Sequence, residues 1–199
     1  MLIILVLATQ FGAPIPTNKS SWVRPDDMPL ELMSEDTVYN VPIRLTIAPD
    51  GKLQSCAGEM LSQSTKLTDH TCKLLRQRAR FRRAINSAGL PSYGVYRTSM
   101  RWWFGTFAPR EWPTFSDLEL TVSTLPPKIK SPATVRLIFN VDEVGRSSSC
   151  TTESSESEPV LVGLGCRELV KSYKAIPARS LQGKPVPSVQ TGTVTFKKS

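Results

Sequence analysis

Apolar and polar residues alternate in two stretches of this chain that lie 94 positions apart. Ile43, Leu45 and Ile47 in the first stretch correspond to Leu137, Phe139 and Val141 in the second. A period of two is typical of a strand that buries one face. The same shift superposes further residues without a gap. The matching pairs are Gly51 and Gly145, Cys56 and Cys150, Leu67 and Leu161, Cys72 and Cys166, Leu75 and Leu169, Ala84 and Ala178, Gly89 and Gly183, Pro91 and Pro185, and Val95 and Val189.

These matches indicate a tandem duplication of one small module, which we assign to residues 37–105 and 131–199. In the first module, alternation predicts a strand over 38–48, a turn at Pro49-Asp50-Gly51 and a second strand over 53–60. Ser62, Ser64 and Thr65 are candidate N-caps for an amphipathic helix over 67–81. After a break at Gly89-Leu90-Pro91, residues 93–104 predict a last strand. The expected buried side of the helix consists of Leu67, Thr71, Leu74, Leu75 and Phe81.

The second module predicts the same order, with a strand over 135–141, a turn at Gly145, a short strand from Cys150, a helix over 164–173 and a last strand over 189–196. We therefore predict an α+β fold of two β-β-α-β modules, each a small antiparallel sheet packed by one helix. Trp102, Trp103 and Phe104 at the end of the first module are expected to pack in a core or between modules.

Two segments lie outside the modules. Residues 1–8 are apolar but too short to span a bilayer, which takes about 20 residues. They are similar to the apolar part of a signal peptide, with candidate cleavage points after Ala8 and Ala13, so we expect an exported protein, soluble or tethered at its N-terminus. Residues 12–36 read as a tether. The proline-rich connector, 106–130, is apolar enough to pack on a module or to add a strand over 118–122.

The cysteines form two equivalent pairs, Cys56 with Cys72 and Cys150 with Cys166. Modules of this size have marginal cores, and a disulfide that closes such a loop contributes about 3 kcal/mol. Disulfides are typical of oxidising compartments. Free thiols are the alternative. A metal site is disfavoured because the chain has no Cys-x-x-Cys and a single histidine, His70.

The net charge of +8 is compatible with nucleic acid, an anionic envelope surface or simple solubility. A local cluster of arginines reads mainly as a solvated surface: Arg76, Arg78, Arg80, Arg82 and Arg83. No nucleophile motif, phosphate-binding loop or repeated carboxylate pair occurs. Asp69 and His70 are adjacent and would point about 100° apart on a helix, so they do not form a dyad. We predict that the protein is not an enzyme and has no cofactor.

The order of these motifs resembles the C-terminal domain of TonB, the periplasmic end of an energy transducer that engages outer-membrane receptors. The first module carries Asp50-Gly51, Leu67 with Asp69, Phe81 with Ala84, and Gly89-Leu90-Pro91. Arg83 stands where the family pattern has a proline. The second module carries Gly145, Ser154-Ser155, Leu161, Pro177-Ala178 and Gly183-Lys184-Pro185, without an acidic residue at the start of its helix.

This resemblance implies a periplasmic protein in which the second strand of each module is tied to the helix. It also implies binding of extended segments of envelope proteins, such as outer-membrane receptor peptides, by strand addition at the last strand. The residues expected at these edges are Val95, Arg97, Ser99, Arg101, Val189, Thr191 and Thr193. The alternative is a structural envelope protein whose modules pair with each other, or a homodimer, without energy transduction. Export and disulfides disfavour a nucleic-acid partner.

Overall fold

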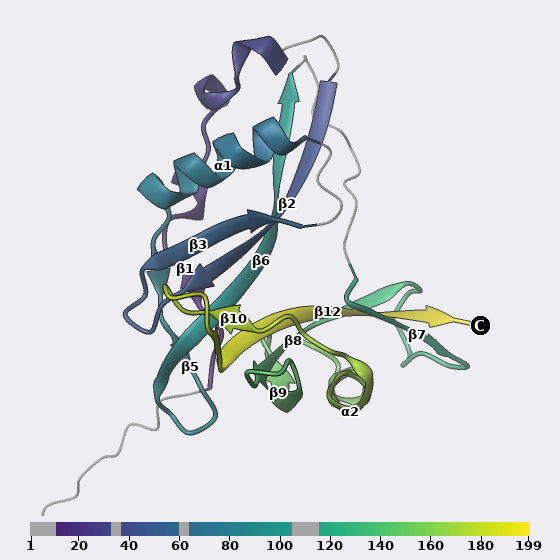
Figure 1. Ribbon diagram of the computed structural model, residues 1–199. Coiled ribbons are helices and arrows are strands. Elements are labelled where there is room, and N and C mark those ends of the chain that lie inside the picture. Colours follow the sequence, from purple (N-terminus) through teal and green to yellow (C-terminus); the bar gives the residue numbers. More distant parts are fainter. Residues whose placement is uncertain (1–10, 33–36, 60–63, 105–115) are drawn as a thin grey trace, which may run out of the picture.

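The computed structural model describes residues 11–32, 37–59, 64–104 and 116–199 (Figure 1). The fold is mixed α/β, with two helices and mostly strands. Both modules contain the predicted strand, strand, helix and strand. In the first module these are β2 (Thr37–Ile47), β3 (Leu53–Gly58), α1 (Thr65–Arg78) and β6 (Pro91–Phe104). In the second they are β8 (Ala133–Val141), β9 (Ser147–Thr152), α2 (Pro159–Ser172) and β12 (Ser188–Lys198).

Shorter elements connect these. The connector contributes β7 (Leu118–Val122), one of the two arrangements that its apolar residues predicted. Each helix is followed by short strands, namely β4 (Phe81–Arg82) and β5 (Ala84–Ile85) after α1, and β10 (Ala178–Arg179) and β11 (Pro185–Val186) after α2. The N-terminal part contains β1 (Ile15–Pro16) and the 3₁₀ turns Lys19–Ser21, Pro25–Asp27 and Leu30–Leu32.

The two modules share one mixed sheet, which corrects the prediction of two separate antiparallel sheets. Eight strands form it, in the order β3-β2-β6-β12-β8-β9, with β5 and β7 beside this path. The junction is a parallel pairing of the two last strands, Tyr93 to Val95 of β6 with Ser188 to Gln190 of β12. Sequence alternation could not reveal this junction because an edge strand offers the same main-chain groups to any neighbouring strand.

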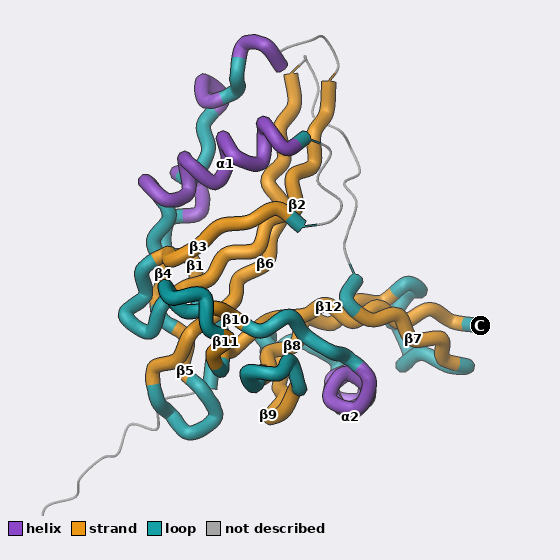
Figure 2. Tube along the Cα trace, in the orientation of Figure 1, coloured by secondary structure: helices purple, strands orange, loops and turns teal. Residues whose placement is uncertain are grey.

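The pairing at the junction is nearly symmetric. Tyr93, Gly94 and Val95 of β6 each pair with the β12 residue 95 positions later, which differs by one position from the repeat shift of 94. Because β6 and β12 are equivalent and parallel, an approximate twofold axis that runs along the strands relates them. A rotation about this axis exchanges the two faces of the sheet between the modules. Gly94 and Val189 pair and so share a face of the sheet. On that face Gly94 lies beside Ile47, in the core under α1, whereas Val189 lies opposite the side that packs on α2. The two helices therefore cover opposite faces, and Figure 2 shows them well apart.

Helix α1 begins and ends for local reasons. The Ser64 hydroxyl accepts the Leu67 main-chain N–H at 3.2 Å and caps the helix, as predicted. Leu67, Thr71, Leu74 and Leu75 are buried, also as predicted. The helix ends at Arg78, not at Phe81, because the chain turns extended at Ala79 and Phe81 pairs with Pro16 of β1. Helix α2 starts at Pro159, earlier than predicted, since the fixed φ of proline suits a first helical position.

Residues 11–32, which we term the strap, pack against the first module, whereas the sequence predicted a tether over 12–36; positions 33–36 lie outside the described residues. Trp22 is fully buried and its ring lies 5.3 Å from that of Phe81. The Asn18 side chain accepts hydrogen bonds from Trp22 Nε1 and Arg80 N, and donates to the Arg78 carbonyl at 2.8 Å. The strap thus contacts the Phe81 ring and main-chain groups at and just after the end of α1, and no periodic sequence pattern signals such contacts.

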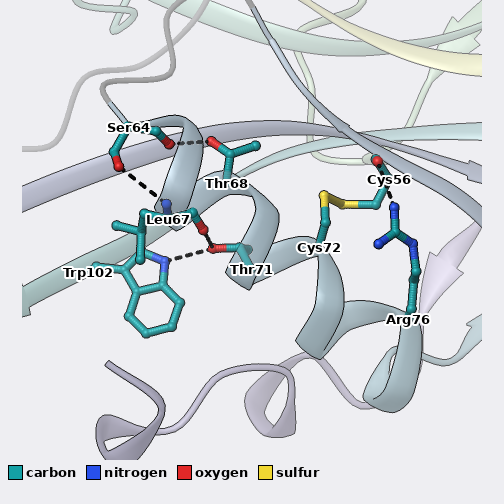
Figure 3. The surroundings of a disulfide bond; sticks show 8 residues. All are labelled: Cys56, Ser64, Leu67, Thr68, Thr71, Cys72, Arg76 and Trp102. Atoms are coloured by element: carbon teal, nitrogen blue, oxygen red, sulfur yellow. Dashed lines mark hydrogen bonds between the residues drawn. A yellow bond between two sulfur atoms is a disulfide. The ribbon is translucent and has the colours of Figure 1, made fainter. Parts of the chain in front are cut away.

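Both predicted disulfides are present, Cys56–Cys72 and Cys150–Cys166, so the alternatives of free thiols and thiolate metal ligands are wrong. Each bond ties the second strand of its module to the helix across a Cα–Cα distance of 5.5 Å. Figure 3 shows the bond of the first module, Cys56–Cys72. Two disulfides fit an oxidising, extracytoplasmic compartment. Among the described helices, none is long and apolar enough to span a membrane.

The repeated glycines are explained by the turns between the first two strands of each module. Gly51 and Gly145 have φ values of 87° and 86°. A Cβ at Gly51 would lie 2.9 Å from the Phe81 carbonyl oxygen, and one at Gly145 would lie 2.2 Å from that of Ala175. Only glycine fits both the backbone conformation and the close approach.

The segments that follow the helices cross to the opposite module. Asn140 Nδ2 of β8 donates to Ser87 Oγ at 2.7 Å, and Gln54 Nε2 of β3 donates to the Arg179 carbonyl at 2.7 Å. Arg44 of β2 donates to the Ile176 carbonyl. A small apolar cluster of Ala13, Ala84, Ile138 and Val189 fills the space beside the junction. These reciprocal contacts join the modules in addition to the strand pairing.

Candidate functional site

The junction opens into a cleft because β6 and β12 diverge beyond Val95 and Gln190 (Figure 1). The cleft has a volume of about 240 Å³. One wall is the side of β6 that faces away from β2 and the other is β12, with contributions from the segments beside them. Five of the seven predicted edge residues line it: Arg97, Ser99 and Arg101 from β6, and Thr191 and Thr193 from β12. The other two, Val95 and Val189, are fully buried at the junction itself.

Strand β12 is not a free edge, contrary to the expectation for the second module. On one side it pairs with β8 from Ser188 to Phe196. On the other it pairs with β6 at Ser188 to Gln190 and, in parallel, with β7 at Val194 to Lys198. The connector supplies the neighbour that the sequence left undecided, so only Thr191 to Thr193 border the cleft.

Strand β6 directs main-chain groups into the cleft. The Pro42 carbonyl of β2 accepts the Glu59 N–H at 2.9 Å, so Pro42 faces the β3 side. Alternate residues of an antiparallel strand face opposite edges. Ile43 and Leu45 therefore bond to β6, where their partners are Thr98 and Tyr96.

It follows that Arg97 and Ser99 point their N–H and C=O groups away from β2, toward the cleft. In the part of the chain that the structure describes, no strand pairs with these two residues on that side. The cleft thus presents a short sheet edge together with the side chains of its two walls.

Arg97 lies at the centre of the site. Its guanidinium makes two hydrogen bonds to the Glu59 carboxylate, at 2.6 and 2.7 Å, and a third to Asp117. Burial would lower the pKa of Arg97, but the hydrogen bonds and charge of Glu59 raise it above its ordinary value. Charge-assisted bonds of this kind hold the side chain firmly. Arg97 therefore links β6 to the ends of β3 and of the connector.

Asp117 is bonded to both modules. Its Oδ2 accepts the Thr193 N–H at 2.8 Å, and its own N–H donates to the Thr193 carbonyl at 2.8 Å. Its other carboxylate oxygen accepts from Arg97 of the first module and from the Tyr173 hydroxyl at 3.4 Å. Asp117 thus lies between the part of β12 that pairs with β6 and the part that pairs with β7.

Two further arginines contribute to the site. Arg136 of β8 pairs with Glu153 at 2.7 Å, donates to the Thr191 hydroxyl at 3.3 Å and lies 5.5 Å from the centre of the Tyr96 ring. Arg44 lies behind the cleft, where burial and the neighbouring charge of Arg97 lower its pKa. The cleft walls carry three arginines, Arg97, Arg101 and Arg136, and the carboxylates of Glu59 and Asp117.

Sequence reasoning missed Glu59, Asp117 and Arg136. Glu59 directly follows β3 and Arg136 sits on the exposed side of an alternating strand, so neither has a local signal. Asp117 had a local signal, because it directly precedes residues 118–122, whose apolar alternation is compatible with a strand. The position of these three residues depends on the junction, which no local pattern contains.

Other candidate residues lie away from the cleft. His70 Nε2 lies 2.7 Å from the Asp27 carbonyl of the strap, and Asp69 is exposed. In the arginine cluster, Arg78 pairs with Asp27, and the other four are exposed. Trp102 is buried and donates to the Thr71 hydroxyl at 3.1 Å, whereas Trp103 is half exposed. Within the described ranges there is no group of three or more His, Cys, Asp or Glu side chains that could hold a metal ion.

Comparison with known proteins does not assign the chain to a family: no protein-family model, no curated protein and no solved structure matches it.

Proposed function

We propose that this chain is a TonB-like protein of the bacterial envelope that binds extended segments of partner proteins by strand addition in the cleft between β6 and β12. The observation that carries the proposal is the direction of the Arg97 and Ser99 main-chain groups, which face the cleft without a described strand opposite them. Such an edge can accept the backbone of an extended peptide, while the adjoining side chains select its sequence.

The second module supports this mode of binding through the repeat. Ser99 of β6 corresponds to Thr193 of β12. The Thr193 N–H and C=O are both engaged by Asp117, and from there β7 continues as a parallel strand. A partner segment that bonds to Ser99 in the same way would lie in the cleft beside Arg97 and Ser99 of β6. The resemblance to TonB implies that such segments belong to outer-membrane receptors, and the disulfides are consistent with a periplasmic location.

The experiment is photo-crosslinking in the native envelope, with a photoreactive residue at Thr134, which is exposed and lines the cleft. In this background Ser99→Pro removes the N–H that faces the cleft, and proline is tolerated at a strand edge. Ser99→Ala is the matched control, since it keeps the main-chain donor. We expect a crosslinked segment of an envelope protein that persists with Ser99→Ala and disappears with Ser99→Pro. Equal capture by both variants would contradict strand addition at β6.

A second candidate is a structural protein in which the pairing of the modules is itself the function. It is favoured by the parallel β6–β12 junction and by the reciprocal contacts across it. Under this reading, Thr134 captures no partner segment, or captures only further copies of this chain, and both Ser99 variants behave alike.

A further inference from the structure

We propose that the edge of β12 from Val194 to Lys198 is a second strand-binding site, and that the chain's own β7 occupies it as a built-in ligand. The inference rests on the proposed function in one respect, namely that an extended segment adds to the last strand of a module. It goes beyond that function because it assigns a second binding site of the same kind to β12, which β7 occupies, in addition to the site at β6.

The contacts of β7 are those of an added strand. Five consecutive residues, from Leu118 to Val122, pair in parallel with Val194 to Lys198. Thr193 and Ser199 direct main-chain groups toward β7, since Thr193 bonds to Asp117 and the Ser199 N–H donates to the Val122 carbonyl at 3.0 Å. By alternation, the N–H groups of Thr195 and Lys197 face β7 as well.

Side chains of β7 fix its register on the second module. Leu118, Leu120 and Val122 are half buried and pack on the core beneath α2, while Glu119 points outward and pairs with Lys197 at 2.7 Å. Alternate apolar residues anchored in a groove and main-chain bonds along an edge are the two components of peptide recognition by strand addition. The strand thus has the contacts of a ligand, although it belongs to the connector.

Strand β7 lies in the connector that precedes the second module, and the equivalent positions before the first module do not form such a strand. Under the shift of 94, β7 corresponds to residues 24–28 of the strap. Those residues lie on the other side of the first module, where Asp27 pairs with Arg78 of α1 and Met28 is buried in the core. Residues 24–28 therefore do not pair with β6, whereas β7 pairs with β12.

The test uses a synthetic peptide with the sequence of residues 116–122, blocked at both ends, and a scrambled peptide as control. In the intact chain the tethered β7 has an effective concentration on the order of millimolar, so the peptide competes poorly. Replacing residues 116–122 by a Gly/Ser stretch of equal length frees the edge. We expect one peptide to bind per chain and to shift the Thr195 and Lys197 amide resonances, with an affinity at least tenfold above that for the intact chain.

A variant that is milder than the replacement guards against misfolding. Asp117→Ala keeps the apolar residues of β7 and removes its first anchor, so peptide binding at β12 should be intermediate. The proposal is overturned if neither variant, with both disulfides formed, binds the peptide better than the intact chain, or if the shifts fall only on β6. Ser99→Pro in either background separates this result from the proposed function, because it acts on β6 and leaves the β12 amides unaffected.

Discussion

Asp117 and Thr193 are joined by two hydrogen bonds of 2.8 Å: the Thr193 N–H donates to Asp117 Oδ2, and the Asp117 main-chain N–H donates to the Thr193 carbonyl. This pairing joins the connector to β12 at the point where the two modules separate. The Asp117 side chain is 11% exposed, and it also bonds to Arg97. One residue outside both modules therefore contacts the last strands of both.

Removing this carboxylate should destabilise the connector. We expect Asp117→Ala to lower the free energy of unfolding by about 2 kcal/mol, because it leaves a buried N–H and part of the Arg97 guanidinium without an acceptor. Asp117→Asn retains an oxygen for the Thr193 N–H and should lose less. Urea denaturation measures both, and hydrogen exchange should locate the loss in residues 118–122 and 193–198. An Ala variant as stable as the Asn variant would argue against this role.

The two disulfides should contribute similarly to stability. Each closes a loop with a sequence separation of 16, for which the chain-entropy estimate is about 3 kcal/mol. We expect the double variants Cys56→Ala/Cys72→Ala and Cys150→Ala/Cys166→Ala to lose comparable stability in thermal and urea unfolding. If one double variant unfolds like the intact protein, then that bond does not stabilise its module.

The strap should contribute to the stability of the first module. Trp22 is fully buried against Phe81 and Tyr96, so Trp22→Ala is expected to cost about 3–5 kcal/mol. Leu30 belongs to the same strap but is 80% exposed, and Leu30→Ala should change stability by less than about 0.5 kcal/mol. Equal effects of the two substitutions on chemical denaturation would mean that the strap acts as a tether after all.

The ion pair of Asp27 with Arg78 should make stability depend on pH in the acid range. A hydrogen bond from Arg78 holds the pKa of Asp27 below its ordinary value of 3.8. Since the folded state lowers this pKa, the pair stabilises the protein fully above the ordinary value, and the contribution is lost as the pH falls toward the lowered one. The stability difference between the intact chain and Asp27→Asn should therefore be largest near pH 6 and shrink by pH 3. A difference that is constant over this range in urea titrations would contradict the coupling.

The sequence predicted local structure well where the signals were local. Alternation located β2, β8 and both last strands, and Ser64 was among the candidate caps of α1. The prediction that α1 extends to Phe81 was wrong, because Phe81 pairs with Pro16 of β1, a distant part of the chain, instead of continuing the helix. The sequence also failed to predict the strap, since Trp22 is buried against Phe81 and Tyr96, which lie far from it along the chain.

For the candidate site too, the sequence predicted the features that depend on local patterns and missed those that depend on distant contacts. Of the predicted edge residues, Arg97, Ser99, Arg101, Thr191 and Thr193 do line the cleft, because the repeat identified the right strands. The expectation that β12 is a free edge was wrong, and Glu59, Asp117 and Arg136 were not foreseen. Whether partner segments bind there stays a prediction, which the Ser99 variants test.

The sequence by itself determined the duplication, the order of elements in each module, the glycine turns and the pairing of the cysteines. These features depend on interactions within one module, where periodicity, turn conformation and spacing act over short separations. Only the tertiary structure decided that β6 and β12 meet in parallel, that the helices lie on opposite faces and that β7 covers one edge but not the other. Main-chain hydrogen bonds between strands are nearly independent of sequence, so the neighbours of each edge are selected by how both modules, the strap and the connector pack together.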